Sequence, residues 1–391
     1  MYMMWRMISY FIVIVLVVVS TSALSSRLWI GEQEQLPERI AVNIDNNETI
    51  AEFGKKYHLD RKSLKKIFSI TSADDLKKQV ADFGMDQEQL SKKVNQALAI
   101  QAEHESKNWF KIPLKGILWI IFLVGVFFLI RKGRIGTRNR KWIYMAAAGV
   151  FGIILGSDPS PMGTVKDAIV LLGSKGVIFP PRLIAFGIFL LMVVLANKFI
   201  CSWGCQFGTL QDLIFRLNRD PKDRKGLFGQ FKIPFIVSNS IRILFFLALI
   251  LVAFIWATDI IGAIDPFKIF KPQVITMAGG LFIGSVLVLS LFVYRPWCHF
   301  FCPFGLLGWL AEKISFFKIK VDYDKCISCQ ACSKACPSNV MDAILKQDRI
   351  IPDCFSCGTC IETCPVNAIS FERGKRQKPP AGVFDKETMN D

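Results

Sequence analysis

CISCQACSKACP (Cys326–Pro337) and CFSCGTCIETCP (Cys354–Pro365) decide the fold of the C-terminal end of this chain. Both runs have the C-x2-C-x2-C-x3-C-P spacing of bacterial ferredoxins. In those proteins three thiolates from one short loop and a fourth from the other run bind a cubane cluster. The two runs therefore predict a bacterial 2×4Fe-4S ferredoxin-like α+β domain over residues 318–372.

The predicted ligands follow from this exchange of the fourth cysteine between the runs. Zinc sites seldom combine such spacing with proline, and a reducing cytoplasm disfavours disulfides. No substrate-binding residues are evident in so small a domain, so single-electron relay is its expected role. We expect two 4Fe-4S clusters, one held by Cys326, Cys329, Cys332 and Cys364 and the other by Cys354, Cys357, Cys360 and Cys336.

The other four of the 12 cysteines form two C-x3-C pairs in a repeated motif. CSWGCQFGTL (Cys201–Leu210) matches CHFFCPFGLL (Cys298–Leu307). Residues four apart on a helix share a face, so two facing pairs could bring Cys201, Cys205, Cys298 and Cys302 onto a third metal ion or cluster. Redox-active thiols and structural packing are the alternative interpretations. His299 is expected to be an interface residue rather than a ligand.

Upstream of the ferredoxin runs the chain is strongly apolar. The whole chain is 52% hydrophobic and 20% charged, with a mean hydropathy of +0.37. This composition excludes disorder for most of the chain and favours a membrane protein. We predict an α-helical integral membrane protein of about six transmembrane helices, whose core is two repeated helical hairpins. The six stretches are Met7–Ser26, Ile112–Ile130, Trp142–Ser157, Pro180–Ile200, Pro234–Ala257 and Ile275–Tyr294.

The net charge of +16 is interpreted as membrane topology rather than as nucleic-acid binding. Six Lys or Arg residues lie in 131–141 and six more in 201–233, whereas the intervening outer loops carry only two each: Lys166 and Lys175, then Lys268 and Lys271. Cytoplasmic loops are the basic ones. The two basic loops, both termini and the ferredoxin domain are therefore predicted to be cytoplasmic.

Residues 1–26 are predicted to be an N-terminal membrane anchor or a signal peptide. The anchor is favoured because the uncharged stretch continues to Ser26. Residues 27–111 are predicted to be a small extracytoplasmic helical domain, either a docking module or a spacer. Within it, two related units over 51–70 and 76–98 are expected to have Asp60 and Asp86 as N-caps.

Residues 112–317 are assigned to a polytopic membrane domain, and residues 373–391 to a flexible polar tail. Trp109, Trp142, Trp256 and Trp297 fit interfacial aromatic belts. Asp158 and Asp265, each followed by proline at the outer membrane edge, are expected to cap turns. Their alternative role is to accept protons from a quinol.

Several cofactors are excluded by missing motifs. No predicted span contains a histidine for haem b, and no Cys-x-x-Cys-His run for haem c occurs. Neither a Walker A motif nor a dinucleotide-binding glycine fingerprint is present, which argues against a pump ATPase and against direct hydride transfer from NADH.

Paired C-x3-C motifs after membrane spans, followed by two ferredoxin motifs, resemble the NapH/NosR-like membrane polyferredoxin family over about residues 112–372. The resemblance implies a four-helix membrane core, two cytoplasmic 4Fe-4S clusters and electron exchange between quinone and a partner redox protein. Gln206 departs from the family, which usually has proline there. The chain also lacks the flavin-attachment motif of NosR-like proteins, so no covalent flavin is expected.

Two functional hypotheses follow for a multi-pass protein of a bacterial or archaeal cell (inner) membrane. The first is relay of single electrons between quinol and a partner redox protein or respiratory metalloenzyme, as in a quinol dehydrogenase subunit. The second is a copper reductase or maturation factor, because soft thiolates suit Cu(I). A cluster-based signalling protein is less well supported, because no output domain is evident. The expected partners are membrane lipid, quinone and a redox protein, with no nucleic acid.

Overall fold

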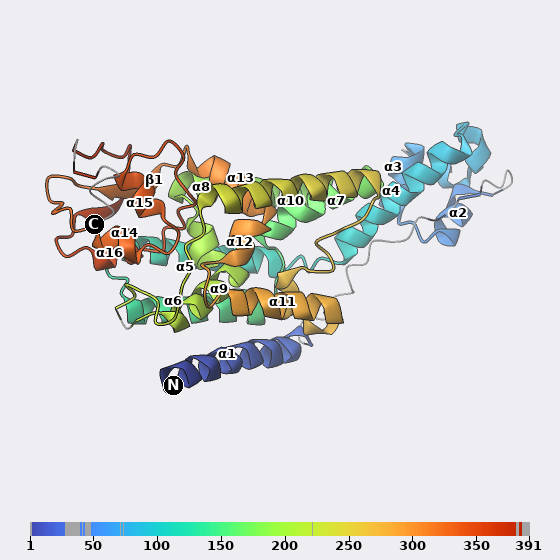
Figure 1. Cartoon of the computed structure of the whole chain (residues 1–391). Helices are drawn as coiled ribbons and strands as arrows, with labels where there is room; N and C mark the ends of the chain where they lie inside the picture. Colours follow the sequence, from blue (N-terminus) through green and yellow to red (C-terminus); the bar gives the residue numbers. More distant parts are fainter. Residues whose placement is uncertain are drawn as a thin grey trace.

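The computed structural model describes residues 2–27, 40, 42–43, 48–70, 72, 74–220, 222–380 and 383–384. Over these residues the chain is almost entirely helical, with one two-stranded sheet. Figure 1 shows long helices running side by side through the middle of the molecule. The cysteine-rich C-terminal domain lies at one end of them and α2–α4 lie at the other.

Among the described residues, three helices are long and apolar enough to cross a membrane: α1 (Tyr2–Ser26), α5 (Lys111–Arg131) and α10 (Phe235–Ile255). Two further apolar helices, α8 (Pro180–Ala196) and α11 (Met277–Leu289), are shorter. Most apolar side chains of the three long helices face outward, where lipid would cover them.

The remaining predicted span, 142–157, is helical as well. It begins as α6 (Thr137–Ala147) and continues as the π-helical segment η3 (Ala148–Ile154). All six apolar stretches are thus helical, but only three meet the length and composition of a span. The count of six spans and the repeated hairpins therefore stay predictions.

The segment 158–179, predicted to be a loop, contains a helix instead: α7 (Pro161–Lys175). The Ser160 hydroxyl accepts a hydrogen bond from the Gly163 N–H at 3.0 Å, and Gly176 ends the helix in the left-handed conformation. These are ordinary start and stop signals. Lys166, counted as a loop charge, is buried and pairs with Asp167 at 2.7 Å and Asp259 at 2.8 Å.

Three of the basic residues used to orient the chain are also buried. Arg140 pairs with Asp223 at 2.6 Å, Arg219 pairs with the same carboxylate at 2.5 Å, and Arg216 pairs with Asp212 at 2.6 Å. Sequence counts cannot separate such structural cations from loop charges that face solvent. The positive-inside argument therefore rests on fewer residues than predicted.

The small domain at the opposite end of the long helices from the C-terminal domain consists of five helical elements. They are α2 (Ile50–Lys56), α3 (Arg61–Phe68), the 3-10 turns η1 (Asp74–Lys77) and η2 (Val80–Phe83), and α4 (Gln87–Glu105). Phe53 and Leu90 are fully buried in its core. Asp60 caps α3 as predicted, because its carboxylate accepts a hydrogen bond from the Ser63 N–H at 2.7 Å. Asp86 occupies the N-cap position of α4 without a side-chain hydrogen bond.

The C-terminal domain is α+β, as predicted. Strand β1 (Phe317–Val321) pairs antiparallel with β2 (Ile369–Arg373), with Phe317 opposite Arg373 and Val321 opposite Ile369. Three short helices lie between the strands: α14 (Ala331–Ala335), α15 (Val340–Leu345) and α16 (Thr359–Thr363). The domain packs on the end of α5, where the Phe127 ring contacts Phe317 and Phe371 at 5.0 and 5.7 Å between centroids.

Two pairs of short elements carry the C-x3-C motifs between the long helices and this domain. The first motif spans the π-helical segment η4 (Ile200–Gly204) and α9 (Gln206–Phe215). The second spans α12 (Pro296–Phe300) and α13 (Pro303–Glu312). Of the predicted tail 373–391, the structure describes residues 373–380 and 383–384. Within it, Phe384 is buried and packs on Tyr323 at 6.1 Å between ring centroids.

Candidate functional site

The four cysteines of the C-x3-C motifs line one cavity, which we call the central cavity. It has an empty volume of about 370 Å³ and is closed by apolar side chains that include Phe207, Phe304 and Trp297. Trp297 is 1% exposed, so its predicted place in an interfacial belt is wrong. The cysteines that line the central cavity are Cys201, Cys205, Cys298 and Cys302.

The two motifs have matching local geometry around this cavity. The Gly305 N–H donates to the Cys302 sulfur at 3.4 Å, and the Gly208 N–H donates to the Cys205 sulfur. A Cβ atom at Gly208 would lie 2.6 Å from the carbonyl oxygen of Cys201, and one at Gly305 would lie 2.7 Å from that of Cys298. Only glycine fits this close approach, which gives the repeated Phe-Gly of the sequence a structural cause.

Each motif is held by cations that lie just before the other motif or on α10. Arg295 Nη1 donates to the carbonyl oxygen of Cys201 at 2.6 Å, and Lys198 Nζ donates to that of Gly305 at 2.6 Å. Arg242 Nη1 donates to the carbonyl oxygen of Cys298 at 3.3 Å. Lys198 and Arg295 are fully buried and Arg242 is 1% exposed.

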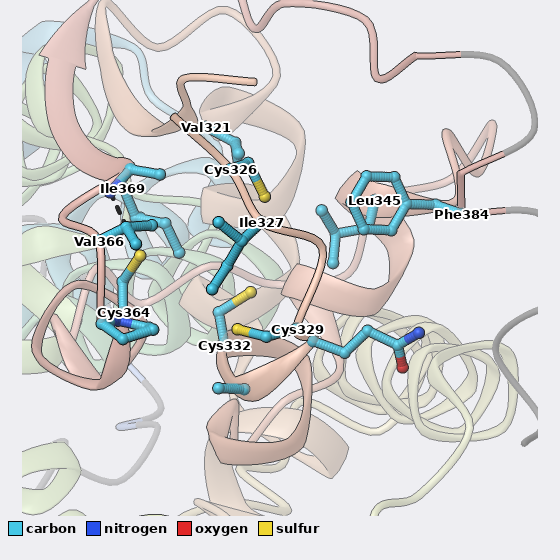
Figure 2. Close-up of a pocket in the computed structure, with 14 residues that line it drawn as sticks. Val321, Cys326, Ile327, Cys329, Cys332, Leu345, Cys364, Val366, Ile369 and Phe384 are labelled. Carbon is cyan, nitrogen blue, oxygen red and sulfur yellow. Dashed lines mark hydrogen bonds between the residues drawn. The ribbon is translucent and has the colours of Figure 1, made fainter. Parts of the chain in front are cut away.

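The ferredoxin runs form two further cavities of the same size. The proximal cavity, named for its place next to the central cavity, is lined by Cys336, Cys354, Cys357 and Cys360 and has an empty volume of about 360 Å³. The distal cavity is lined by Cys326, Cys329, Cys332 and Cys364 and has an empty volume of about 360 Å³. Figure 2 shows the last four side chains around one space, with Ile327 among them. The structure thus places the eight cysteines in two groups of four. In each group three cysteines come from one ferredoxin run and the fourth comes from the other run.

Short helices link the proximal and distal cavities. Cys332 and Cys336 are one helical turn apart along α14, and Cys360 and Cys364 are one turn apart along α16. In each pair, one cysteine lines the distal cavity and the other the proximal cavity. Because residues four apart on a helix lie about 5–6 Å apart between Cβ atoms, the two cavities are neighbours.

The three cavities differ in their distance from solvent. Cys329 is exposed and the neighbouring Ile327 is 61% exposed, so the distal cavity borders the surface. In the proximal cavity, Cys336, Cys354 and Cys360 are buried. Burial raises the pKa of Cys354 and of Cys332 to about 12. These thiols therefore keep their protons at neutral pH unless a metal replaces them.

Two buried carboxylates organise the charges between the cavities. Asp353 is fully buried and pairs with Lys198, and with Arg242 at 2.9 Å. Burial would raise its pKa, but Arg242 and Lys198 lower it to about 2. Asp212 accepts hydrogen bonds from Arg295 Nη2 at 2.6 Å and from the Tyr294 hydroxyl at 2.8 Å.

This network carries more positive than negative charge. Six buried cations share three buried carboxylates, and Glu362 reaches Arg140 from the rim at 3.0 Å. Uncompensated charge is costly in a protein interior, whereas a cubane with four thiolate ligands is anionic. The surplus therefore fits iron–sulfur clusters in these cavities. The cations are Arg140, Lys198, Arg216, Arg219, Arg242 and Arg295, and the carboxylates are Asp212, Asp223 and Asp353.

Two more observations bear on what the central cavity can hold. The Trp297 indole N–H has no hydrogen-bond partner among the described residues, so a donor is left for a bound acceptor. In the same part of the chain, no group of three or more His, Cys, Asp or Glu side chains is close enough to hold a single metal ion. The thiols of the two ferredoxin cavities are also too far apart to bind a single metal ion. Such a wider spacing is needed to bind the four iron atoms of a cubane.

The other predicted residues lie outside the cavities. His299 Nδ1 is 3.6 Å from the Asp353 carboxylate, and its ring packs on Phe355 at 5.4 Å between centroids, as expected of an interface residue. Asp265 accepts a hydrogen bond from the Phe267 N–H at 2.9 Å, which is the capping role predicted for it. Asp158 pairs with Lys271 at 2.7 Å.

Comparison with known proteins agrees with this geometry. A 4Fe-4S dicluster domain model matches residues 318–374, and a 4Fe-4S binding domain model matches residues 178–228 and 275–322, which contain both C-x3-C motifs. The putative electron transport protein YccM of Escherichia coli is 32% identical over 166 residues, which are 39% of this chain and 44% of YccM. The regulatory protein NosR of Pseudomonas aeruginosa is 27% identical over 147 residues, which are 35% of this chain and 19% of NosR.

These likenesses support the resemblance to the NapH/NosR-like membrane polyferredoxins. An uncharacterized protein of Methanocaldococcus jannaschii is also 28% identical to this chain over 154 residues, 39% of this chain and 56% of the relative. The chain thus spans about half the length of the first two of these curated relatives, YccM and the archaeal protein. No solved structure matches it.

Sequence reasoning did not find the buried charges that hold the cysteine motifs. No sequence motif contains Lys198, Asp212, Arg242 or Asp353. Arg242 lies in an apolar stretch, and the sequence does not show which residue pairs with it. The usable signal was a charged residue within a predicted span, which is expected to have a buried partner.

Proposed function

We propose that this protein is a membrane-bound iron–sulfur protein that passes single electrons between the quinone pool and a partner redox protein. One observation carries the proposal: three cavities of about 360–370 Å³, each lined by four cysteines, follow one another from between the apolar helices to the surface of the C-terminal domain. Such a series of cubane sites suits electron relay. The likeness to YccM, a putative electron transport protein, supports the same class of function.

The central cavity is proposed to hold a third 4Fe-4S cluster, with Cys201, Cys205, Cys298 and Cys302 as ligands. Its volume, its four thiols, its sulfur-directed N–H groups and the surplus of buried cations all resemble or suit the ferredoxin sites. A cluster there would link the apolar helices to the two clusters of the C-terminal domain.

The proposed topology has six spans, with the ferredoxin domain in the cytoplasm and residues 27–111 outside a bacterial or archaeal cell membrane. It is supported by the separation of these two domains at opposite ends of the long helices (Figure 1). The proposed domain limits are 1–26, 27–111, 112–317, 318–372 and 373–391.

A quinol that delivers electrons to the central cavity must also lose two protons. The outer side of the cavity is lined by Pro161, Met162 and Phe267, which follow the two Asp-Pro turns. Of these turns, the one at Asp265 offers a base: burial raises the pKa of its carboxyl to about 6, which suits proton acceptance near neutral pH. We propose Asp265 as a proton acceptor in quinol oxidation, in addition to its capping role.

Reduction by quinol tests the proposed function. The purified holoprotein in lipid nanodiscs is mixed anaerobically with menaquinol, and cluster reduction is followed by EPR and visible absorbance. The expected result is reduction of the clusters by menaquinol, and loss of that reduction in the Cys201→Ser/Cys298→Ser variant, while dithionite still reduces both proteins. Clusters that dithionite reduces and that no quinol reduces would contradict the proposal.

Copper reduction or maturation of a copper enzyme is the alternative function, and thiolate affinity for Cu(I) is its chemical basis. No feature of the structure favours it over the relay. Anaerobic Cu(I) titration of the wild-type protein and of the Cys201→Ser/Cys298→Ser variant tests this alternative function. Copper binding that persists in the variant excludes the C-x3-C pairs as the copper site.

A further inference from the structure

The loop Asp353–Ser356 joins the central cavity to the proximal cavity. Cys354 lines the proximal cavity, and the next residue, Phe355, lines both. Among the described residues, Phe355 is the one side chain common to the two linings. It is 4% exposed, so it is shielded from bulk solvent.

The Phe355 ring is fixed by neighbours that lie in or just before the two C-x3-C motifs. The Arg295 guanidinium carbon lies 4.9 Å from the ring centroid and Lys198 Nζ lies 5.5 Å from it. Tyr294 and His299 contact the ring edge-on, at 5.8 and 5.4 Å between centroids. Cations above an aromatic face and edge-on rings are both attractive arrangements.

The backbone on either side of Phe355 is held as firmly. Asp353 pairs with Lys198 and Arg242, and the carbonyl oxygen of Ser356 accepts a hydrogen bond from the Trp203 indole N–H at 3.2 Å. The Cys354 N–H donates to Glu312 at 3.3 Å. Residues of the membrane domain therefore contact each residue of this loop.

We propose that Phe355 is the bridge across which electrons pass between the central and proximal cavities. This inference rests on the proposed function, since it assumes clusters in both cavities. In each step the central cluster is oxidised by one electron and the proximal cluster is reduced by one electron, and no proton or bond moves. Quinol is the reductant that refills the central cluster.

The bridge makes a specific kinetic prediction. A smaller, non-aromatic side chain leaves a gap between the two cavities, and the rate of electron transfer falls steeply with the gap. Phe355→Leu should therefore slow the menaquinol-dependent reduction of the proximal cluster several-fold, whereas Phe355→Tyr, which keeps the ring, should stay near the wild-type rate. Phe53→Leu, the same substitution at a fully buried position in the distant α2–α4 domain, is the matched control and should not change the rate.

Rapid-freeze EPR on the holoproteins in nanodiscs measures the order and rate of cluster reduction. The magnetic interaction between reduced clusters, and their iron and sulfide content, are measured on the same samples. The proposal expects slow transfer in Phe355→Leu with unchanged cluster content and unchanged magnetic interaction. A wild-type rate in Phe355→Leu overturns it, and so does a slow rate accompanied by an altered magnetic interaction, because that result means displacement of the clusters.

The Cys201→Ser/Cys298→Ser protein separates this proposal from the proposed function. If that protein loses quinol-dependent reduction while Phe355→Leu keeps the wild-type rate, the relay stands and the bridge lies elsewhere. If the cysteine variant also reduces its proximal cluster at the wild-type rate, electrons do not pass through the central cavity, so the bridge fails while the quinol-dependent relay stands. If no quinol reduces the clusters of the wild-type protein, the proposed function itself fails.

Discussion

Asp353 offers the sharpest test of how the ferredoxin domain is joined to the membrane domain. The substitution Asp353→Asn keeps the shape of the side chain and removes its charge. Lys198 and Arg242, both buried, then lose their shared carboxylate. Removing one partner of a buried ion pair costs about 3–5 kcal/mol. We take the lower end, about 3 kcal/mol, because the amide oxygen still accepts a hydrogen bond.

A loss of that size is measurable by thermal unfolding. For a cooperative unit of about 150–250 residues, about 1 kcal/mol shifts Tm by about 2–4 °C, so Asp353→Asn should lower Tm by roughly 10 °C. The melt of the detergent-solubilised holoprotein is followed by cluster absorbance and by circular dichroism. The matched control is Asp348→Asn, an exposed acid of the same domain, which should change stability by less than about 0.5 kcal/mol.

A double variant tests whether charge is the cause. Lys198→Met in the Asp353→Asn background removes one of the two orphaned cations, so the double variant should lose less stability than the sum of the single variants. Equal melting of Asp353→Asn and Asp348→Asn, or strict additivity with Lys198→Met, would refute the reasoning from buried charge.

Three further predictions concern separate parts of the molecule. Gly305→Ala places a Cβ 2.7 Å from the Cys298 carbonyl oxygen, so iron should fall from about twelve to about eight atoms per chain; Gly284→Ala, which meets nothing within 4 Å, should keep the wild-type iron content. The rate of quinol-dependent reduction should rise with pH through about 6, because the base form of Asp265 accepts the proton; a flat profile, or the same profile in Asp265→Asn, would remove Asp265 from the mechanism. Asp60→Ala removes the cap of α3 and should cost about 1 kcal/mol in the α2–α4 domain, with cluster spectra unchanged; altered spectra would mean that this domain is coupled to the clusters.

Cysteine spacing predicted the C-terminal domain in detail because cluster ligation restricts it so strongly. The α+β domain and the division of its eight cysteines between two cavities both follow from the spacing of two short runs. The repeated Phe-Gly after each C-x3-C pair also carried real information: Gly208 and Gly305 occupy equivalent close approaches to the cysteine backbone.

The sequence patterns did not predict which charged residues are buried. Arg140, Arg216 and Arg219 were counted as basic residues of cytoplasmic loops, and in the structure they are buried in ion pairs with Asp212 and Asp223. A window of sequence records the charge of a residue but not its partner, which lies up to 83 residues away. The helix α7 was missed because the whole segment between the predicted spans 142–157 and 180–200 was taken as a loop.

Iron and acid-labile sulfide per chain test the central claim most directly, together with Mössbauer spectroscopy of protein grown on 57Fe. The account predicts about twelve iron atoms in three cubanes for the anaerobically purified protein, and about eight in two cubanes for Cys205→Ser/Cys302→Ser. About eight iron atoms in both proteins, with identical spectra, would contradict a cluster in the central cavity.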